Sequence, residues 1–210
     1  MNYGQLRDHV LKLINQYSIA GNKIASSYNN QQDYLNRIPA FANDAMMEIA
    51  TTVRKIPTIV KVADLPCEDL GEDIRFTMPA DFYQLKSGDT IRLQDGHVIP
   101  EGGFMQVASR YVIVKKDIAE QAMELTYYRY PHPLKAQPND EDVLDNDVDT
   151  HYAIPYYVAS FLVPDDNEYL SSMLYNKFED KLGKLTNVIS ADITKVTDAY
   201  GYDQMFVYDV

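Results

Sequence analysis

The amino-acid sequence predicts an α+β protein, a four-helix bundle with an antiparallel β-rich insertion between helices 2 and 3. Apolar residues recur every three or four positions near both ends of the chain, which is the period of one helix face. The middle instead has short β-branched and aromatic segments separated by turn residues. We therefore expect residues 1–56 and 139–189 to form the bundle, residues 57–138 an inserted lobe, and residues 190–210 an extended aromatic tail.

Two helices are expected before the insertion, at residues 3–17 and 31–55. Pro39 lies inside the second helix and should kink it or restart it with proline in a first turn, and Pro57 should stop it. The apolar face of the first helix consists of Leu6, Val10, Leu13, Ile14 and Tyr17. That of the second consists of Tyr34, Ile38, Phe41, Ala45, Ile49, Val53 and Ile56.

The middle of the chain contains strand-like segments with short turns between them. Asp95-Gly96 is a strong hairpin signal, because this pair suits the tight turn between two antiparallel strands. Repeated short strands of this kind predict an antiparallel sheet or a small barrel. A short helix is considered at residues 118–123. The strand-like segments are residues 57–64, 74–78, 83–85, 90–93, 97–99, 104–108, 111–114 and 123–130.

The helical period returns after a proline-rich linker and an acidic stretch at residues 139–149. Asp149 or Thr150 is expected to be the N-cap of a third helix that ends near Val163. Pro155 lies too deep for a first turn, so we expect a kink or a later start. The face of this helix consists of Tyr152, Tyr156, Ala159 and Leu162.

The last helix is expected at residues 167–189, capped by Asp165-Asp166. Its stripe consists of Leu170, Leu174, Phe178, Leu182, Leu185 and Ile189. The tail that follows is rich in aromatic side chains, which need to be covered by something. They either fold back on the protein's own bundle or lie on a partner, where they could add a strand to its sheet. The predicted contact residues are Tyr200, Tyr202, Phe206 and Tyr208.

Charge and composition exclude several classes of protein. The chain has 19 basic and 31 acidic residues and a net charge of −12, which disfavours wrapping nucleic acid. Residues 1–63 hold seven basic and four acidic residues, a net charge of +3, and the other 147 hold 12 and 27, a net charge of −15. Such a split suits self-association between unlike surfaces and also arises by chance.

The single cysteine excludes an internal disulfide. Without an apolar run of about 20 residues or a signal-peptide core, we expect a soluble protein made inside the cell.

No catalytic or metal-binding motif stands out. The glycines form neither a dinucleotide fingerprint nor a phosphate loop, no serine lies in a nucleophile elbow, and the four histidines are scattered. Asp145, Asp147 and Asp149 imitate the start of a calcium loop, but Thr150 and Tyr156 occupy the places of the required glycine and glutamate. We therefore predict no catalytic residue, no metal ligand and no cofactor.

Three segments carry a resemblance to a known family. Residues 78–85 (MPADFYQL) are similar to the LP-x-D-F-hydrophobic start of the inserted β region in head-to-tail adaptor (connector) proteins of tailed bacteriophages. Residues 149–162 resemble the third helix of these proteins, and residues 165–182 resemble their last helix. The chain departs from the pattern at Met78, where leucine is usual, and at Pro155 inside the third helix.

The resemblance implies a structural role without catalysis. Such a protein forms a ring of twelve copies (a dodecamer), docks below the portal protein, contacts tail proteins, and lets DNA pass through a channel without reading its sequence. It is made in the cytoplasm of the bacterial host, becomes part of the virion and needs no membrane. Two alternatives remain: a β lobe that binds a peptide or carbohydrate through its tyrosines, and a hydrolase that uses an acidic pair.

Overall fold

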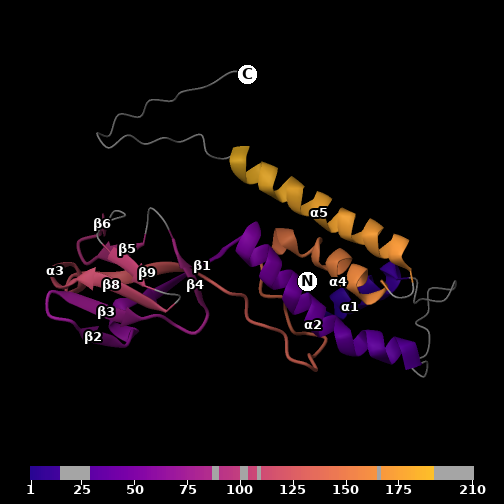
Figure 1. Ribbon diagram of the computed structural model, residues 1–210, viewed down its shortest axis with the longest axis horizontal. Coiled ribbons are helices and arrows are strands. Elements are labelled where there is room, and N and C mark those ends of the chain that lie inside the picture. The colour runs from indigo at the N-terminus through magenta and orange to yellow at the C-terminus, as the bar shows by residue number, and fades with distance from the viewer. Residues whose placement is uncertain (15–28, 87–89, 100–103, 108–109, 165–166, 192–210) are drawn as a thin grey trace, which may run out of the picture. The chain divides into compact units, whose positions relative to one another are not determined.

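The computed structural model describes residues 1–14, 29–86, 90–99, 104–107, 110–164 and 167–191, which belong to two compact units (Figure 1). The helical unit comprises Met1–Ile49 and the described residues from Leu134 onward, and the β unit comprises Ala50–Pro133. Two helices come first, two antiparallel sheets follow, and two further helices end the described part. This order confirms the predicted α+β class, and the four main helices pack together.

The first helix, α1 (Tyr3–Leu13), begins with a capping box. The side-chain oxygen of Asn2 accepts a hydrogen bond from the backbone N–H of Gln5 at 2.9 Å, and the side-chain oxygen of Gln5 accepts one from the backbone N–H of Asn2 at 3.2 Å. Two orphan donors of the first turn are thereby satisfied. The helix ends earlier than residue 17, because Ile14 already forms its C-cap, and residues 15–17 lie outside the described part.

The second helix, α2 (Asn29–Thr52), continues through Pro39. The restart considered at this proline is therefore wrong, and Pro39 is buried inside a continuous helix. Phe41, expected in the apolar stripe, is only half-buried. The buried residues of α2 are Tyr34, Ile38, Pro39, Ala42, Ala45, Met46, Ile49 and Ala50.

The third main helix, α4 (Ile154–Leu162), starts late, as the position of Pro155 allowed, and Pro155 lies in its first turn. The predicted N-cap at Asp149 or Thr150 is wrong. These residues belong to a preceding 3₁₀ turn, η2 (Val148–Thr150), whose own cap is Asp147, which accepts a hydrogen bond from the N–H of Asp149. Tyr152, expected on the buried face, precedes α4 and is 66% exposed.

The last helix, α5 (Glu168–Ala191), packs along α4 (Figure 1). The side-chain oxygen of Asn167 accepts a hydrogen bond from the N–H of Leu170 at 2.9 Å, so this asparagine caps the helix. The predicted caps, Asp165-Asp166, lie outside the described residues. Three residues of the predicted stripe are buried, namely Leu174, Phe178 and Leu182.

The β unit contains nine described strands. The Asp95-Gly96 hairpin is confirmed: Ile91 pairs with Ile99, and Gly96 has the positive φ of 87° that such a turn needs. The strands are β1 (Ile56–Lys61), β2 (Cys67–Asp69), β3 (Asp73–Thr77), β4 (Phe82–Leu85), β5 (Ile91–Leu93), β6 (Val98–Ile99), β7 (Phe104–Val107), β8 (Tyr111–Lys115) and β9 (Ala122–Arg129).

These strands form two antiparallel sheets. In one sheet, β1 pairs along one edge of β9, while β4 and β5 pair along the other edge and β6 extends β5. The other sheet has the order β2-β3-β8-β7. Two short helical turns connect strands, η1 (Val62–Asp64) and α3 (Lys116–Ala119). The short helix considered at residues 118–123 is thus shifted, because β9 already begins at Ala122. β2 was not predicted.

The two sheets share one apolar core. Phe76, Val112 and Val114 come from the sheet around β8, and Leu125 and Tyr127 come from β9 in the other sheet. All the described members of this core lie within the β unit.

Candidate functional site

The four residues predicted to contact a partner lie outside the described part of the chain. Tyr200, Tyr202, Phe206 and Tyr208 all follow Ala191, the last described residue. Their role therefore stays a prediction. The described residues offer two other surfaces, both on the helical unit, which the sequence patterns had not singled out.

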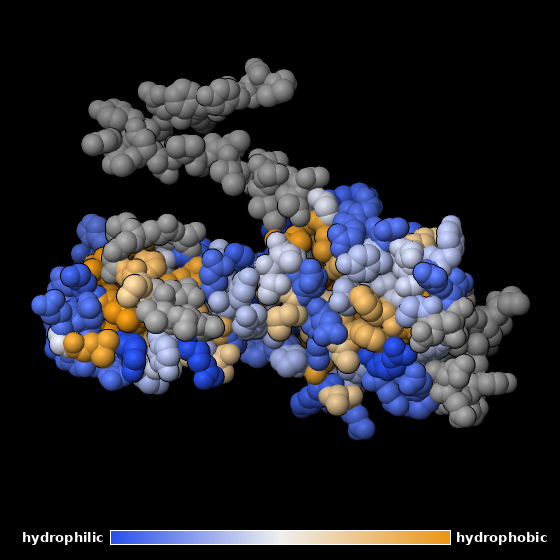
Figure 2. Space-filling view, viewed as in Figure 1, coloured by the Kyte–Doolittle hydropathy of each residue, from blue (hydrophilic) through white to orange (hydrophobic). Residues whose placement is uncertain are grey.

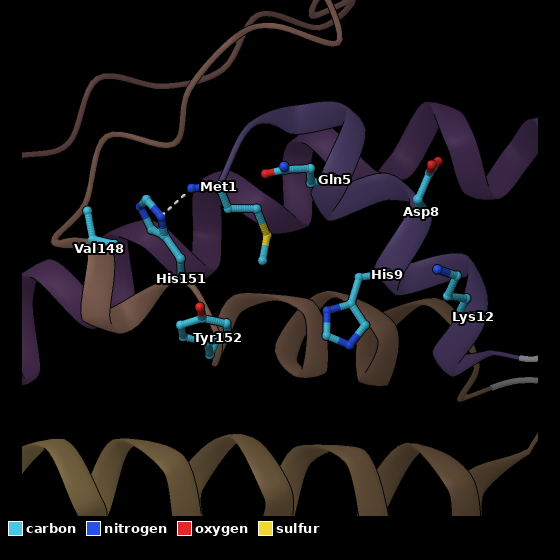
Figure 3. Close-up of a pocket in the computed structure, with 8 residues that line it drawn as sticks. All are labelled: Met1, Gln5, Asp8, His9, Lys12, Val148, His151 and Tyr152. Carbon is cyan, nitrogen blue, oxygen red and sulfur yellow. Dashed lines mark hydrogen bonds between the residues drawn. The ribbon is translucent and has the colours of Figure 1, made fainter.

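The first surface surrounds a pocket beside α1, with a volume of about 640 Å³ (Figure 3). Side chains from α1 and from the segment around η2 line it, and Tyr152 stands at its side. Among the described residues its polar lining consists of two histidines, a lysine, a carboxylate, a tyrosine and a glutamine. The lining consists of Met1, Gln5, Asp8, His9, Lys12, Val148, His151 and Tyr152.

His151 is fixed in this pocket by two hydrogen bonds. Its Nδ1 accepts a hydrogen bond from the amino group of Met1 at 2.7 Å, and its Nε2 lies 3.1 Å from the carbonyl oxygen of Asn146, to which it donates. Burial lowers the pKa of His151, and the positive amino group of Met1 lowers it further. The ring is therefore neutral at pH 7 and serves as a structural hydrogen-bonding group.

Two lysines flank the other histidine of the pocket. The rings of His9 and Tyr156 meet edge-on with centroids 5.9 Å apart, and Lys181 Nζ lies 4.9 Å from the centroid of Tyr156. Burial lowers the pKa of His9, and the charges of Lys12 and Lys181 lower it further. We call this surface the lysine face, defined by His9, Lys12, Val148, His151, Tyr152, Tyr156 and Lys181.

The second surface is an aromatic cluster between α2, α4 and α5. The ring of Tyr157 lies 4.7 Å from that of Phe161 and 5.0 Å from that of Phe178, and Tyr175 completes the cluster at 6.3 Å from Tyr157. Phe41 of α2 stacks on Phe161 at 5.8 Å. Phe178 is fully buried, whereas Phe161 and Tyr175 are each 38% exposed, so the cluster reaches the surface.

Carboxylates surround the exposed part of this cluster. Burial raises the pKa of Tyr157, and the negative charges of Asp44 and Glu48 raise it further. Burial likewise raises the pKa of Tyr175, followed by the charge of Glu179 and a hydrogen bond to it. We call this surface the acidic aromatic face, defined by Phe41, Asp44, Met47, Glu48, Tyr157, Phe161, Tyr175 and Glu179.

A hollow of about 460 Å³ opens beside the acidic aromatic face. Phe161 and Tyr175 form its aromatic side, and Ser171 Oγ donates a hydrogen bond to the carbonyl oxygen of Ser160 at 2.9 Å within its lining. Apolar atoms reach the surface among polar ones over the helical unit (Figure 2). The hollow has both aromatic walls and polar groups, as protein-binding surfaces commonly do.

The two faces lie on different sides of α4. Tyr156 belongs to the lysine face and Tyr157 to the acidic aromatic face, and consecutive helical residues point about 100° apart. On α5, Tyr175 and Lys181 are six positions apart, which places them about 120° apart around the helix. The adjacent tyrosines were visible in the sequence, but which side chains gather around each depends on contacts between distant helices.

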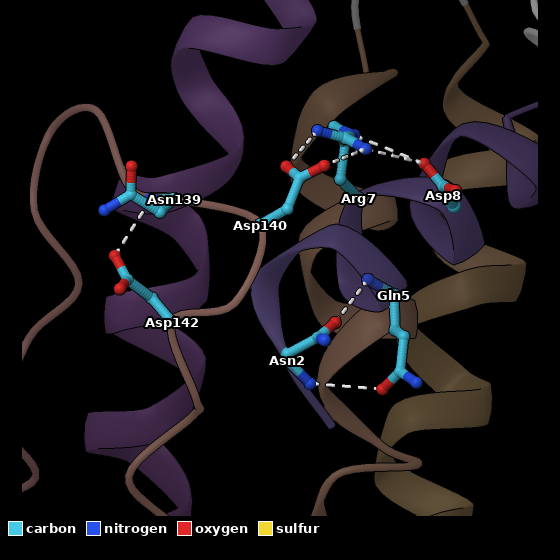
Figure 4. Close-up of polar contacts among 7 residues, drawn as sticks. All are labelled: Asn2, Gln5, Arg7, Asp8, Asn139, Asp140 and Asp142. Carbon is cyan, nitrogen blue, oxygen red and sulfur yellow. Dashed lines mark hydrogen bonds and ion pairs between the residues drawn. The ribbon is translucent and has the colours of Figure 1, made fainter.

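The lysine face is held in place by contacts between α1 and the acidic stretch (Figure 4). Arg7 forms a two-pronged ion pair with Asp140, with Nη2 3.1 Å from Oδ2, and also contacts Asp8 at 3.2 Å. Gly4 approaches Asp140 so closely that a Cβ at this position would lie 3.1 Å from the Asp140 Cβ. The acidic stretch thus anchors α1.

The β unit uses its aromatic residues mostly within itself. The Tyr127 hydroxyl donates a hydrogen bond to Asp81 at 3.1 Å, and the rings of Tyr83 and Tyr130 lie 5.0 Å apart. Arg75 lies over the ring of Tyr111 at 5.0 Å. Cys67 is exposed and free.

Over the described ranges, no three histidine, cysteine or carboxylate side chains gather as metal ligands would. In the same part of the chain, no helix is long and apolar enough to span a bilayer. Comparison with protein families and with curated proteins gave no match for this chain.

Proposed function

We propose that the protein is a structural subunit of the head–tail connector ring of a tailed bacteriophage, docked below the portal and joined to the tail. The observation that carries this proposal is the order of its elements. Four packed helices come from two chain segments, Met1–Ile49 and the residues after Leu134, with a β unit of its own core inserted between them. This is the layout predicted from the spacing of apolar residues, and a helix pair, a β insertion and a second helix pair also resemble the order of elements in the adaptor proteins.

In this proposal the four helices form a bundle that is the body of the ring, and the β unit contacts the next ring or the tail. A subunit in a closed ring needs two unlike patches, and the helical unit has two. The net charge of −12 suits a channel wall that repels phosphate, so that DNA slides through it. The tail tyrosines and Phe206 dock on a neighbouring protein.

The test is imaging of the full chain, alone and with the portal protein of the same phage, by negative-stain electron microscopy and native mass spectrometry. The proposal expects closed rings with a central channel. A protein that stays monomeric even with the portal present contradicts it. Clear binding to a peptide or glycan array without assembly would favour the β-lobe binding module instead.

The role of the tail has a separate test. A variant with serine at Tyr200, Tyr202, Phe206 and Tyr208 should still form rings but lose binding to the neighbouring protein, measured by co-purification. Unchanged binding would show that these four side chains make no partner contact.

A further inference from the structure

We propose that the lysine face of one copy docks on the acidic aromatic face of a second copy, and that these two faces are the halves of the contact between neighbours. This inference rests on the proposed ring. In a head-to-tail ring, each subunit uses two different patches that complement each other. Symmetric pairing of identical patches would instead close at a dimer.

Charge complementarity supports this pairing. Asp44, Glu48 and Glu179 are exposed around the aromatic cluster, and the one described cation over it, Arg37 above the ring of Phe41, is paired with Asp33. On the other face, Lys12 is exposed and Lys181 is half-buried over Tyr156. Carboxylates also lie beside the lysine face: Asp8 is bridged to Arg7, and Asp147 and Asp149 are exposed on either side of Val148. Opposite charges on two surfaces orient their encounter.

Both faces also offer apolar anchors. On the acidic aromatic face, Phe161 and Tyr175 are each 38% exposed and Met47 is 41% exposed, next to the hollow of about 460 Å³. On the lysine face, Tyr152 and Val148 are each 66% exposed beside the pocket of about 640 Å³. Exposed aromatic residues near a hollow are typical anchors of protein interfaces. Tyr152 is the side chain best placed to enter the hollow of a neighbour.

A second copy fits the acidic aromatic face better than an acidic ligand does. Nucleic acid would meet like charge at Asp44, Glu48 and Glu179. The protein's own residues 192–210 contain four acidic residues and one lysine, so they too would be repelled by this face. The carboxylates around the acidic aromatic face favour a surface that carries lysines, and the lysine face is such a surface on the other side of α4.

The experiment reverses the charge of one face at a time in the full chain. The first variant is Asp44→Lys with Glu48→Lys, and the second is Lys12→Glu with Lys181→Glu. Each variant alone should associate at least about tenfold more weakly than the wild type in sedimentation velocity at low salt, because like charges then meet at the contact. An equimolar mixture of both should recover association, because each altered face then meets an opposite one.

Two controls separate this effect from misfolding and from net charge. Circular dichroism melting must show that each variant is folded, and recovery in the mixture shows it independently. Asp64→Lys with Glu72→Lys raises the net charge as Asp44→Lys with Glu48→Lys does, but on exposed positions of the β unit, and should leave association unchanged. Deletion of residues 192–210 should leave it unchanged as well. If that deletion weakens association as the charge reversals do, the tail occupies one of the faces and the proposed pairing is wrong.

The outcomes distinguish this inference from the proposed function. If rings form in the wild type and in both charge-reversed variants, the connector proposal stands and the pairing of these faces is wrong. If the wild type forms open chains that the reversals disrupt and the mixture restores, the pairing stands and the ring is wrong. If the wild type remains a monomer with the portal present, both are wrong.

Discussion

The helical unit and the β unit differ in how far apart in the sequence their contacts lie. The β unit is one continuous segment, Ala50–Pro133, and several of its strand pairs join neighbours, such as β5 with β6 and β7 with β8. The helical unit joins two segments that the β unit separates. The side-chain oxygen of Asn43 accepts a hydrogen bond from the backbone N–H of Leu134 at 2.7 Å, and its amide nitrogen donates one to the carbonyl oxygen of Leu134 at 3.0 Å. The side chain of Asn146 donates a hydrogen bond to the carbonyl oxygen of Met46 at 3.2 Å.

The two units also use their charges differently. In the β unit, Lys116 pairs with Asp69 at 2.6 Å and Arg75 pairs with Glu68, so that opposite charges meet within the unit. The helical unit also pairs opposite charges, such as Arg7 with Asp140, and in addition carries Asp44, Glu48 and Glu179 around one face and Lys12 and Lys181 on the other. The comparison teaches that one continuous segment forms the β unit, whereas the helical unit depends on contacts between two segments that lie far apart in the sequence.

The largest expected effect is a loss of stability that tests whether the two units unfold independently. Phe178 is fully buried and contacts Tyr157 and Tyr175, so Phe178→Ala should leave a cavity that destabilises the helical unit by about 3–5 kcal/mol. Hydrogen exchange measured by mass spectrometry should show lost protection in α1, α4 and α5 and unchanged protection in β9.

The matched change in the β unit is Leu125→Ala, because Leu125 is 1% exposed in the core of that unit. It should cost about 2–5 kcal/mol and lower protection in β8 and β9 while sparing α4 and α5. Equal loss of protection in both units from either substitution would show that the chain unfolds as one cooperative body, and the contrast drawn above would fail.

The helices and strands were largely predictable because they depend on local pattern. The stripe of α5 and the Asp95-Gly96 hairpin follow from spacing and turn chemistry that act over a few residues. The errors lie where neighbours in space decide. The acidic cap expected for α4 was wrong because Asp147 caps a separate 3₁₀ turn first, and β2 was missed because Cys67–Asp69 gains its pairing from β3 without an apolar pattern of its own.

The two faces could not be predicted in the same way. Lys181 and His9 lie 172 positions apart in the sequence and meet at Tyr156 only after α1 and α5 pack on α4. Asp44 and Glu48 appear in the sequence as ordinary exposed residues of α2, and their closeness to Tyr157 depends on how α2 packs against α4. The sequence shows that the N-terminal part is basic and the rest acidic, but it does not show which charged groups share a surface.

A smaller effect on stability is expected at Tyr127 in the β unit. Burial, followed by the hydrogen bond to Asp81, raises the pKa of Tyr127 to about 12, from an ordinary value of 10.0. Tyr127→Phe removes that hydrogen bond and should cost about 1 kcal/mol at pH 7. The native tyrosine keeps its proton longer than the unfolded one, so its contribution is full below pH 10 and is lost as the pH rises towards 12.

Urea unfolding between pH 8 and about 11.5 measures this contribution as the difference between the wild type and Tyr127→Phe. The difference should shrink as the pH rises, since the wild type alone loses the tyrosine contribution. A constant difference across that range would show that Tyr127 ionises at the same pH in the native and unfolded states, contrary to its buried contact with Asp81.

The smallest expected effect concerns acid sensitivity of the helical unit. Burial and nearby positive charges hold the pKa of both His9 and His151 below their ordinary value of 6.5 in the native state. The unfolded chain therefore takes up protons first, so this contribution to stability is present above pH 6.5 and is lost as the pH falls through the native pKa values.

His9→Gln should reduce the slope of unfolding free energy against pH between about pH 7 and 5.5. If His9→Gln leaves the slope unchanged, the acid sensitivity does not arise at the lysine face.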